Sequence, residues 1–385
     1  MKVAFLTNIL TPYRVYFFDV LYKQLGKDKL KCFVMTDKLP LRPWNYSELR
    51  REYTMLLKGK KVLIRGNDYL FSYNVRSAIL EYDPDILIVA GSWTYPTTWD
   101  VMMSKKITKS MKILFWTESH NHTGIHNTTK TKPIARKIKQ LLMKRFDGFC
   151  VPGEYAKETI SNLIDLTQKT VIRLPNLIDN AYYDYANQMR KSKNQLREVN
   201  GVGNEQFVFF TPASMRELKG QLPFFKNVVN VVKGKPVTFV LAGEGPDREA
   251  IEKIGLDHDL NLCILRYQNQ EQIREWFALS DAFLLPSLSD ANPLSNIEAA
   301  WAGLPLCVSC YVGNGPELVE DGINGVIFDT LDVDSVSEKI MFVINQNKEW
   351  LSTAGVVSHR KAQEGFDAET ESKKFLVSLE ESLKY

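Results

Sequence analysis

The 385-residue chain has few cysteines, no long apolar run and little net charge. Its five cysteines are odd in number and scattered, which argues against a disulfide framework and favours a reducing compartment. No apolar stretch approaches the roughly 18 residues that span a bilayer. The apolar start is interrupted by Asn8, Pro12 and Arg14, and no small-residue cleavage site of a signal peptide follows. These features lead us to expect a cytosolic protein. Because a net charge of +4 is mild for this length, we expect no nucleic-acid binding.

The residues that are present predict two α/β domains. Apolar residues make up 44% of the chain and charged residues 24%, as in ordinary globular proteins, and the length suits two domains of roughly 150 residues or more. In the first half, short apolar runs alternate with amphipathic stretches. The runs 86–90 and 113–117 lack polar alternation, as expected of parallel strands that are covered on both faces. After the polar stretch 179–206, a second alternation of the same kind begins.

Repeated β-α units predict doubly wound parallel sheets with right-handed crossovers. The fold class is therefore α/β, with one Rossmann-like domain over 1–185 and a second over 186–361. Residues from 335 to the end are expected to be helical. Two such sheets in tandem place a cleft at the carboxyl ends of both sets of strands.

One stretch, 285–305, carries the strongest chemical signal and reads LPSLSDANPLSNIEAAWAGLP. Pro293 excludes a single helix from Asp290 to Glu298, so a helix is expected to begin at Pro293 or Leu294, with Asn292 as its N-cap. Free amides and the helix dipole at that start favour an anion. Carboxylates at Asp290 and Glu298 can accept hydroxyls on either side of it. A nucleotide sugar fits these features, and an N-capped helix with two solvated acids is the alternative.

Two further strand ends carry polar or flexible residues. Arg216 and Lys219 follow the strand FVFFTPA, where two cations can neutralise a pyrophosphate leaving group. Gly243 and Gly245 end the next strand, in LAGEGP, and allow a close backbone approach. The third glycine of the dinucleotide fingerprint is missing, so a nicotinamide enzyme gains little support.

In this order, the motifs resemble the C-terminal domain of the family-4 retaining glycosyltransferases, which have the GT-B fold. The resemblance covers about 207–329 and rests on Lys219 with Gly220, then on LAGEGP, DAFLLPS, IEAAWAGLP and GNGPELVEDGINGVIFD. The first half is more loosely similar to a bacterial subgroup, through FLTNILTPYRVYFFDVL, FWTES and RLPNLIDNAYYD. The resemblance implies that 1–185 binds the acceptor, that 186–361 binds the nucleotide sugar, and that a C-terminal helix over 362–385 packs back on the first domain.

The same resemblance implies roles for individual residues. Lys219 is similar to the lysine that binds the diphosphate, and Glu298 to the glutamate that holds the ribose. Asp290 stands where most members have a glutamate that contacts the donor sugar. Arg216 lies three residues before the lysine, whereas the family arginine usually lies five before it, at Ser214 here. The donor phosphates would lie against the backbone of four consecutive residues: Ala291, Asn292, Pro293 and Leu294.

The stretch FWTESHNHTGIH allows more than one interpretation. His120, His122 and His126 suggest a metal site, but this spacing without a thiolate or an acid pair is poor evidence for zinc, so we expect no metal. Many family members have a histidine where this chain has Glu118. We expect Glu118, or else His120, to lie near the reacting carbon, the alternative being that Glu118 caps the next loop.

The N-terminal Gly-Gly loop of many family members is absent, and TPYR occupies its place. Tyr13 and Arg14 are therefore candidates to line the donor or acceptor site, and a simple loop role is equally consistent with their position.

A basic amphipathic helix is predicted over 130–146, where seven lysines and arginines occur and where Ile134, Ile138, Leu141 and Leu142 have helical spacing. Such a helix can rest on anionic lipid, or it can be an ordinary surface helix that packs one face on the sheet.

The leading hypothesis is a metal-independent retaining glycosyltransferase with no cofactor beyond its nucleotide-sugar donor. Its acceptor would be a glycan or a lipid-linked glycan in cell-surface polysaccharide assembly, at the inner face of the cell membrane. A nucleotide-sugar epimerase on the GT-B scaffold and a non-catalytic, two-lobed sugar-binding protein remain as alternatives.

Overall fold

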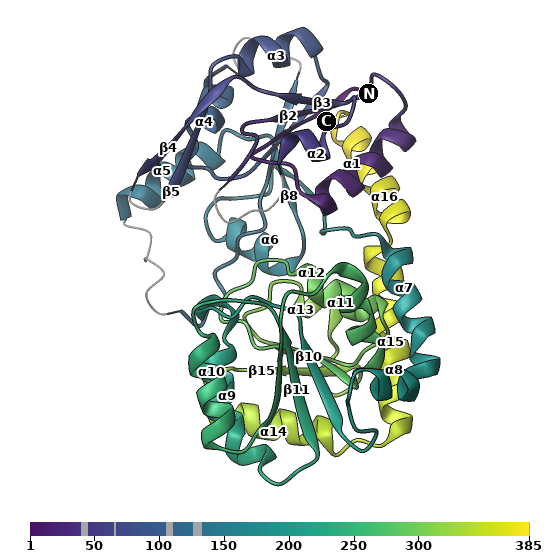
Figure 1. Ribbon diagram of the computed structural model, residues 1–385. Coiled ribbons are helices and arrows are strands. Elements are labelled where there is room, and N and C mark those ends of the chain that lie inside the picture. The colour runs from purple at the N-terminus through teal and green to yellow at the C-terminus, as the bar shows by residue number, and fades with distance from the viewer. Residues whose placement is uncertain (40–44, 65–66, 105–110, 126–132, 385) are drawn as a thin grey trace. The chain divides into compact units, whose positions relative to one another are not determined.

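The computed structural model describes residues 1–39, 45–64, 67–104, 111–125 and 133–384. They form two compact units, the first made of Met1–Ser119, Thr129–Leu177 and Ala368–Tyr385, the second of His120–Thr128 and Ile178–Asp367. Apart from His120–Thr128, the second unit begins at residue 178, where the sequence suggested 186, and the chain returns to the first unit at residue 368, where the sequence suggested 362. Figure 1 follows this course by colour.

The first unit is built on a seven-stranded parallel sheet with the order β3-β2-β1-β6-β7-β8-β9. Its strands are β1 (Val3–Thr7), β2 (Leu30–Val34), β3 (Thr54–Leu56), β6 (Ile86–Ala90), β7 (Lys112–Trp116), β8 (Gly148–Val151) and β9 (Thr170–Arg173). A separate antiparallel hairpin joins β4 (Gly59–Ile64) to β5 (Asn67–Ser72). The helices are α1 (Pro12–Leu25), α2 (Tyr46–Leu49), α3 (Val75–Tyr82), α4 (Pro96–Ser104), α5 (Pro133–Met143), α6 (Glu154–Ser161) and α16 (Ala368–Ser382).

Both faces of this sheet are covered, which explains why β1 and β6 are buried along their whole length. Alternate residues point to opposite faces of a strand. Phe5 packs with α1 and α16 in one apolar cluster, and Leu6 packs with α3, α4, α5 and α6 in the other. The last helix, α16, also lies against β9, where Glu371 forms an ion pair with Arg173 at 2.5 Å.

The second unit has a six-stranded parallel sheet with the order β12-β11-β10-β13-β14-β15. Its strands are β10 (Phe207–Thr211), β11 (Val237–Ala242), β12 (Asn261–Leu265), β13 (Ala282–Leu285), β14 (Leu306–Ser309) and β15 (Gly325–Phe328). Its helices are α7 (Asn180–Met189), α8 (Lys193–Val199), α9 (Gln221–Val232), α10 (Arg248–Asp257), α11 (Gln270–Leu279), α12 (Leu294–Trp301), α13 (Gly315–Leu318), α14 (Val333–Ile344) and α15 (Lys348–Phe366), with short 3₁₀ turns η1 (Arg190–Ser192) and η2 (Glu217–Lys219).

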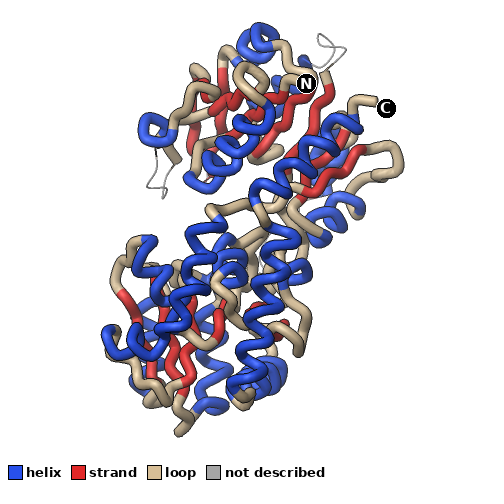
Figure 2. The backbone as a smooth tube through the Cα atoms, turned by 90° about the vertical axis from the view of Figure 1, so that its right-hand side faces the viewer, coloured by secondary structure: helices blue, strands red, loops and turns tan. Residues whose placement is uncertain are grey.

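This strand order is that of a doubly wound Rossmann sheet, in which the winding direction reverses between the first and fourth strands, here β10 and β13. In such sheets, ligands bind outside the carboxyl ends of the strands at the point of reversal. The alternation of helix and strand in each unit, visible in Figure 2, confirms the predicted α/β class.

None of the helices within the described ranges is both long enough and apolar enough to cross a membrane.

Candidate functional site

The site predicted in the second half of the sequence lies at the reversal point of the second sheet. Lys219 ends η2, shortly after β10, and Asp290 lies in the loop after β13. The Nζ atom of Lys219 donates a hydrogen bond to Oδ2 of Asp290, which makes the two residues an ion pair. Their side chains are 17% and 15% exposed, so the pair is largely shielded yet still reachable from solvent. An entering anion would compete with Asp290 for the Lys219 ammonium group.

His120 joins this pair from a segment that precedes it by far in the sequence but belongs to the same unit. Its Nε2 atom lies 3.1 Å from the backbone carbonyl oxygen of Asp290. Burial lowers the pKa of His120, which favours a neutral ring at pH 7. The following residues bond to the same loop, since Gly124 N and Thr123 Oγ1 donate to Leu288 O at 2.8 and 3.1 Å. The segment 120–124 therefore holds the loop that carries Asp290.

The start of α12 lies directly after Asp290, but its cap differs from the prediction. Pro293 is the N-cap residue, with φ −66° and ψ 129°, and α12 begins at Leu294. The expectation that Asn292 caps the helix is wrong, because its side chain is 6% exposed and accepts a hydrogen bond from Asn314 Nδ2 at 3.1 Å. Asn314 also donates to Pro293 O at 2.9 Å. Pro293 makes no side-chain hydrogen bond to the amides of the first turn, and such amides can bind an anion.

Ala291 and Leu294 complete the stretch that the sequence assigned to phosphate binding. Both lie at this loop and helix start, between Asp290 and the first turn of α12. A buried asparagine, Asn296, donates from Nδ2 to Asn314 Oδ1 at 2.9 Å and thereby ties α12 to the loop that carries Asn314.

Glu298 lies one turn into α12 and faces α7. The hydroxyl of Tyr183 donates to its Oε1 atom at 3.0 Å. Burial raises the pKa of Glu298 to about 7, although the hydrogen bond from Tyr183 works in the opposite direction. The carboxylate therefore changes its charge near neutral pH, and its ability to accept two hydroxyls of a ligand changes with it.

Gly243 and Gly245 lie after β11, and the structure explains both by packing within the protein. A Cβ atom at Gly243 would collide with the backbone oxygen of Ala213, and one at Gly245 with that of Met215. The close backbone approach predicted from the sequence is thus an approach between two loops of the second unit. No contact on these residues indicates a ligand.

Arg216 precedes η2 as its N-cap residue and is exposed. Its side chain forms no hydrogen bond or ion pair with any residue in the described ranges. The structure therefore brings Lys219, Asp290 and His120 together but leaves Arg216 outside their bonding network.

Three of the residues predicted from the first half of the sequence, Tyr13, Arg14 and Glu118, lie in the first unit. Tyr13 and Arg14 begin α1, and Arg14 Nη1 donates to Thr7 Oγ1 at 2.7 Å. Its Nη2 atom lies 3.9 Å from Glu118 Oε1, and its guanidinium carbon lies 5.0 Å from the ring centre of Trp116. Arg14 thus neutralises Glu118 at the carboxyl ends of β1 and β7, and the catalytic role of Glu118 stays a prediction.

Within the described residues, His120 and His122 belong to no metal-binding cluster. Within the described part of the chain, no group of three or more His, Cys, Asp or Glu side chains is arranged to hold an ion. His122 lies near His120, with ring centres 6.0 Å apart, and His126 lies outside the described residues.

Sequence reasoning missed Tyr183, Asn296 and Asn314. The sequence stretch around Tyr183 was assigned to the end of the first domain, so no partner on α12 was expected. Asn314 follows the apolar strand β14, just as Asp290 follows β13. The same sequence pattern could therefore have identified Asn314.

Comparison with known proteins agrees with this geometry. Residues 192–353 match the family of glycosyl transferases group 1. The chain is 24% identical to the putative glycosyltransferase EpsF of Bacillus subtilis (strain 168) over 75% of this chain and 73% of that protein. It is 25% identical to the alpha-monoglucosyldiacylglycerol synthase of Acholeplasma laidlawii, over 58% of this chain and 55% of that protein.

The fold is shared more widely than the sequence. The crystal structure of Anabaena HepE in complex with UDP aligns over 99% of this chain and 100% of that chain, with a TM-score of 0.75 at 15% identity. Residues 192–353 therefore match the group 1 glycosyl transferases, and the chain has the GT-B fold.

Proposed function

We propose that the chain is a metal-independent retaining glycosyltransferase that moves a sugar from a nucleotide diphosphate to a hydroxyl of a glycan or lipid-linked acceptor in cell-surface polysaccharide assembly. The observation that carries the proposal is the Lys219–Asp290 pair, which lies at the reversal point beside the start of α12. A diphosphate there would meet one cation and several free amides, with Glu298 one turn away for the ribose.

Each site residue of the second unit has a part in the proposed reaction. Lys219 and the amides of α12 stabilise the negative charge that develops on the leaving diphosphate. Release of Lys219 frees the Asp290 carboxylate to accept a hydroxyl of the donor sugar. His120 keeps the Asp290 loop in place through the 3.1 Å contact to its carbonyl oxygen. The acceptor attacks on the face from which the diphosphate leaves, and the leaving oxygen takes the acceptor's proton.

A donor screen tests the proposal. Purified protein is incubated with UDP-, GDP- and ADP-sugars in the presence of EDTA, with and without lipid and glycan extracts, and nucleoside diphosphate release is measured. We expect release from one nucleotide class that increases when an acceptor is added, and NMR of the product should show the anomeric configuration of the donor.

Other outcomes of the screen identify the alternatives. Conversion of the donor sugar without any acceptor would indicate an epimerase. Nucleotide-sugar binding without diphosphate release under any condition would indicate a binding protein and would contradict the proposal.

Helix α5 supports the lipid side of this proposal. Ile134, Ile138 and Leu141 are 73%, 42% and 65% exposed, whereas Leu142 and Met143 are buried. The apolar stripe that could have packed on the sheet thus faces solvent for most of its length, beside the cations of the same helix. Exposed apolar side chains flanked by lysine and arginine suit the interface of an anionic bilayer. The beginning of the predicted helix, 130–132, lies outside the described residues.

Replacing Leu141 with glutamate should weaken binding to vesicles that contain phosphatidylglycerol by about tenfold, because it removes apolar burial and adds repulsion from the lipid charge. Vesicle sedimentation measures this. Leu256→Glu is the matched control, since Leu256 is 84% exposed on α10 of the other unit. Equal vesicle binding by both variants would refute a membrane role for α5.

A further inference from the structure

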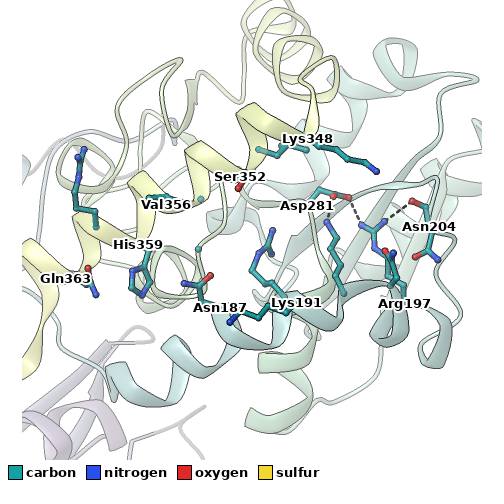
Figure 3. A pocket seen from close by; sticks show the side chains of 17 residues that line it. Asn187, Lys191, Arg197, Asn204, Asp281, Lys348, Ser352, Val356, His359 and Gln363 are labelled. Carbon is teal, nitrogen blue, oxygen red and sulfur yellow. Dashed lines mark hydrogen bonds and ion pairs between the residues drawn. The ribbon is translucent and has the colours of Figure 1, made fainter.

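A cavity lies at the edge of the second unit opposite to the candidate site. It is a cavity of about 660 Å³ between α7 and α8 on one side and α15 on the other (Figure 3). Asp281, which lines it, directly precedes β13, and Gly303 follows α12. These positions mark the amino ends of the strands, whereas Lys219 and Asp290 follow carboxyl ends. The cavity is therefore separate from the proposed donor site.

The charges of this cavity are unbalanced. Asp281 is the sole carboxylate among its lining residues, which all lie in the described part of the chain. The cationic side chains that line it are Arg190, Lys191, Lys193, Arg197, Lys348 and Arg360. A drug-sized ligand fits a cavity of this volume, and the surplus of cations means that such a ligand would be anionic.

Two of these cations form ion pairs within the protein. Asp281 forms ion pairs with Lys193 and with Arg197, the latter at 2.5 Å, as the dashed lines of Figure 3 show. Arg197 is 3% exposed and also donates to Leu279 O at 3.0 Å. These ion pairs lie in the cavity lining and account for its one carboxylate and two of its cations.

Three other cations keep donor atoms that are not bonded within the described ranges. Arg190 donates from Nη1 to Ser280 O at 3.0 Å, while its Nε and Nη2 atoms have no partner in the described ranges. Lys191 and Lys348 are exposed at the rim, and their solvated ammonium groups likewise have no partner among the described residues. Burial lowers the pKa of Lys193 to about 8, and the nearby guanidinium groups of Arg190 and Arg197 add to this effect.

We propose that this cavity binds a small polyanion with at least two phosphate groups, held by Arg190, Lys191 and Lys348. A guanidinium and two ammonium groups around one recess suit phosphate oxygens, which accept charge-assisted hydrogen bonds. Lys193 and Arg197 are paired with Asp281, and Arg360 forms an ion pair with Glu364 at 3.9 Å, which leaves Arg190, Lys191 and Lys348 as the lining cations without an ion pair in the described ranges. The inference goes beyond the proposed transferase function and does not depend on it.

Inorganic pyrophosphate is the probe, and isothermal titration calorimetry measures its binding. Because pyrophosphate could also occupy the donor site, all variants carry Lys219→Ala. In this background we expect one binding site, and Lys191→Ala with Lys348→Ala should weaken it by about tenfold or more, as expected for the loss of two charge-assisted bonds. Lys233→Ala with Lys235→Ala is the control, since both lysines are exposed near the start of β11.

Phosphate groups can also belong to lipid, so a second arm uses vesicles that contain cardiolipin, whose headgroup has two phosphates. Weaker vesicle binding by the Lys191 and Lys348 variant than by the control would identify a headgroup as the source, whereas weaker pyrophosphate binding alone would identify a soluble ligand. If the pocket and control variants behave alike in both arms, the inference is overturned. Since neither measurement requires turnover, a failed donor screen would leave this result unaffected.

Discussion

Replacing Glu298 with glutamine is expected to lower kcat/KM for the nucleotide-sugar donor by about 100-fold. The carboxylate can accept two hydroxyls of a ribose, and hydrogen bonds to a charged group contribute about 1.5 kcal/mol or more each. Glutamine keeps the shape and an acceptor for Tyr183, so the unfolding midpoint should stay within about 2 °C of the wild type. Steady-state kinetics with the donor found in the screen and thermal unfolding together check this. Unchanged kinetics would remove Glu298 from the site.

The pH dependence gives this prediction a second readout. Because burial raises the pKa of Glu298 to about 7, its carboxyl is largely neutral below that pH and ionised above it. Nucleotide affinity should therefore rise as the pH increases through about 7, and the Glu298→Gln variant should lack this rise. Tyr183→Phe keeps the carboxylate but removes the hydrogen bond that lowers its pKa, so the midpoint should move to higher pH. Calorimetric titration with the nucleoside diphosphate between pH 5.5 and 8.5 measures all three profiles.

The sequence could predict the fold and the core of the site because both follow from local patterns. Apolar runs without alternation predicted buried parallel strands, and β6 was predicted with its observed bounds. Lys219 and Asp290 were identified because each follows a strand, and parallel strands of one sheet present their carboxyl ends on the same edge. Pro293 fixed the start of α12 to within one residue because of its conformational restriction.

What the sequence could not predict depends on contacts between distant segments. Tyr183 reaches Glu298 only because α7 packs on α12, and nothing local to either residue indicates this. His120 meets Asp290 across 170 positions of the chain. Asn292 has the residue type of an N-cap, but the buried amide of Asn314 takes its side chain instead. The exposure of Ile138 on α5 was also undetermined, because a helical apolar stripe has the same spacing whether it packs on a sheet or faces solvent.

Replacing Lys219 with alanine should lower kcat by about 10²–10³-fold, the effect of removing one preorganised donor to a developing negative charge. The ion pair with Asp290 makes a sharper test available. In the free protein Asp290 competes with the diphosphate for Lys219, so Asp290→Asn should bind the free nucleoside diphosphate more tightly than the wild type. The same variant should turn over more slowly, because the carboxylate that would receive the sugar hydroxyl is lost.

This opposition between binding and turnover separates a catalytic pair from a merely structural one. If the pair only stabilised the fold, both single variants would lower the unfolding midpoint and leave nucleotide affinity unchanged. If the pair serves the reaction, the Lys219→Ala and Asp290→Ala double variant should lose less activity than the two single variants imply, because each single change already disables the same arrangement. Measuring kcat, nucleotide affinity and the unfolding midpoint for the full cycle decides between the two. Asp290→Glu, which adds one methylene, should restore part of the turnover lost in Asp290→Asn, since a carboxylate on a longer arm can still pair with Lys219 and accept a hydroxyl.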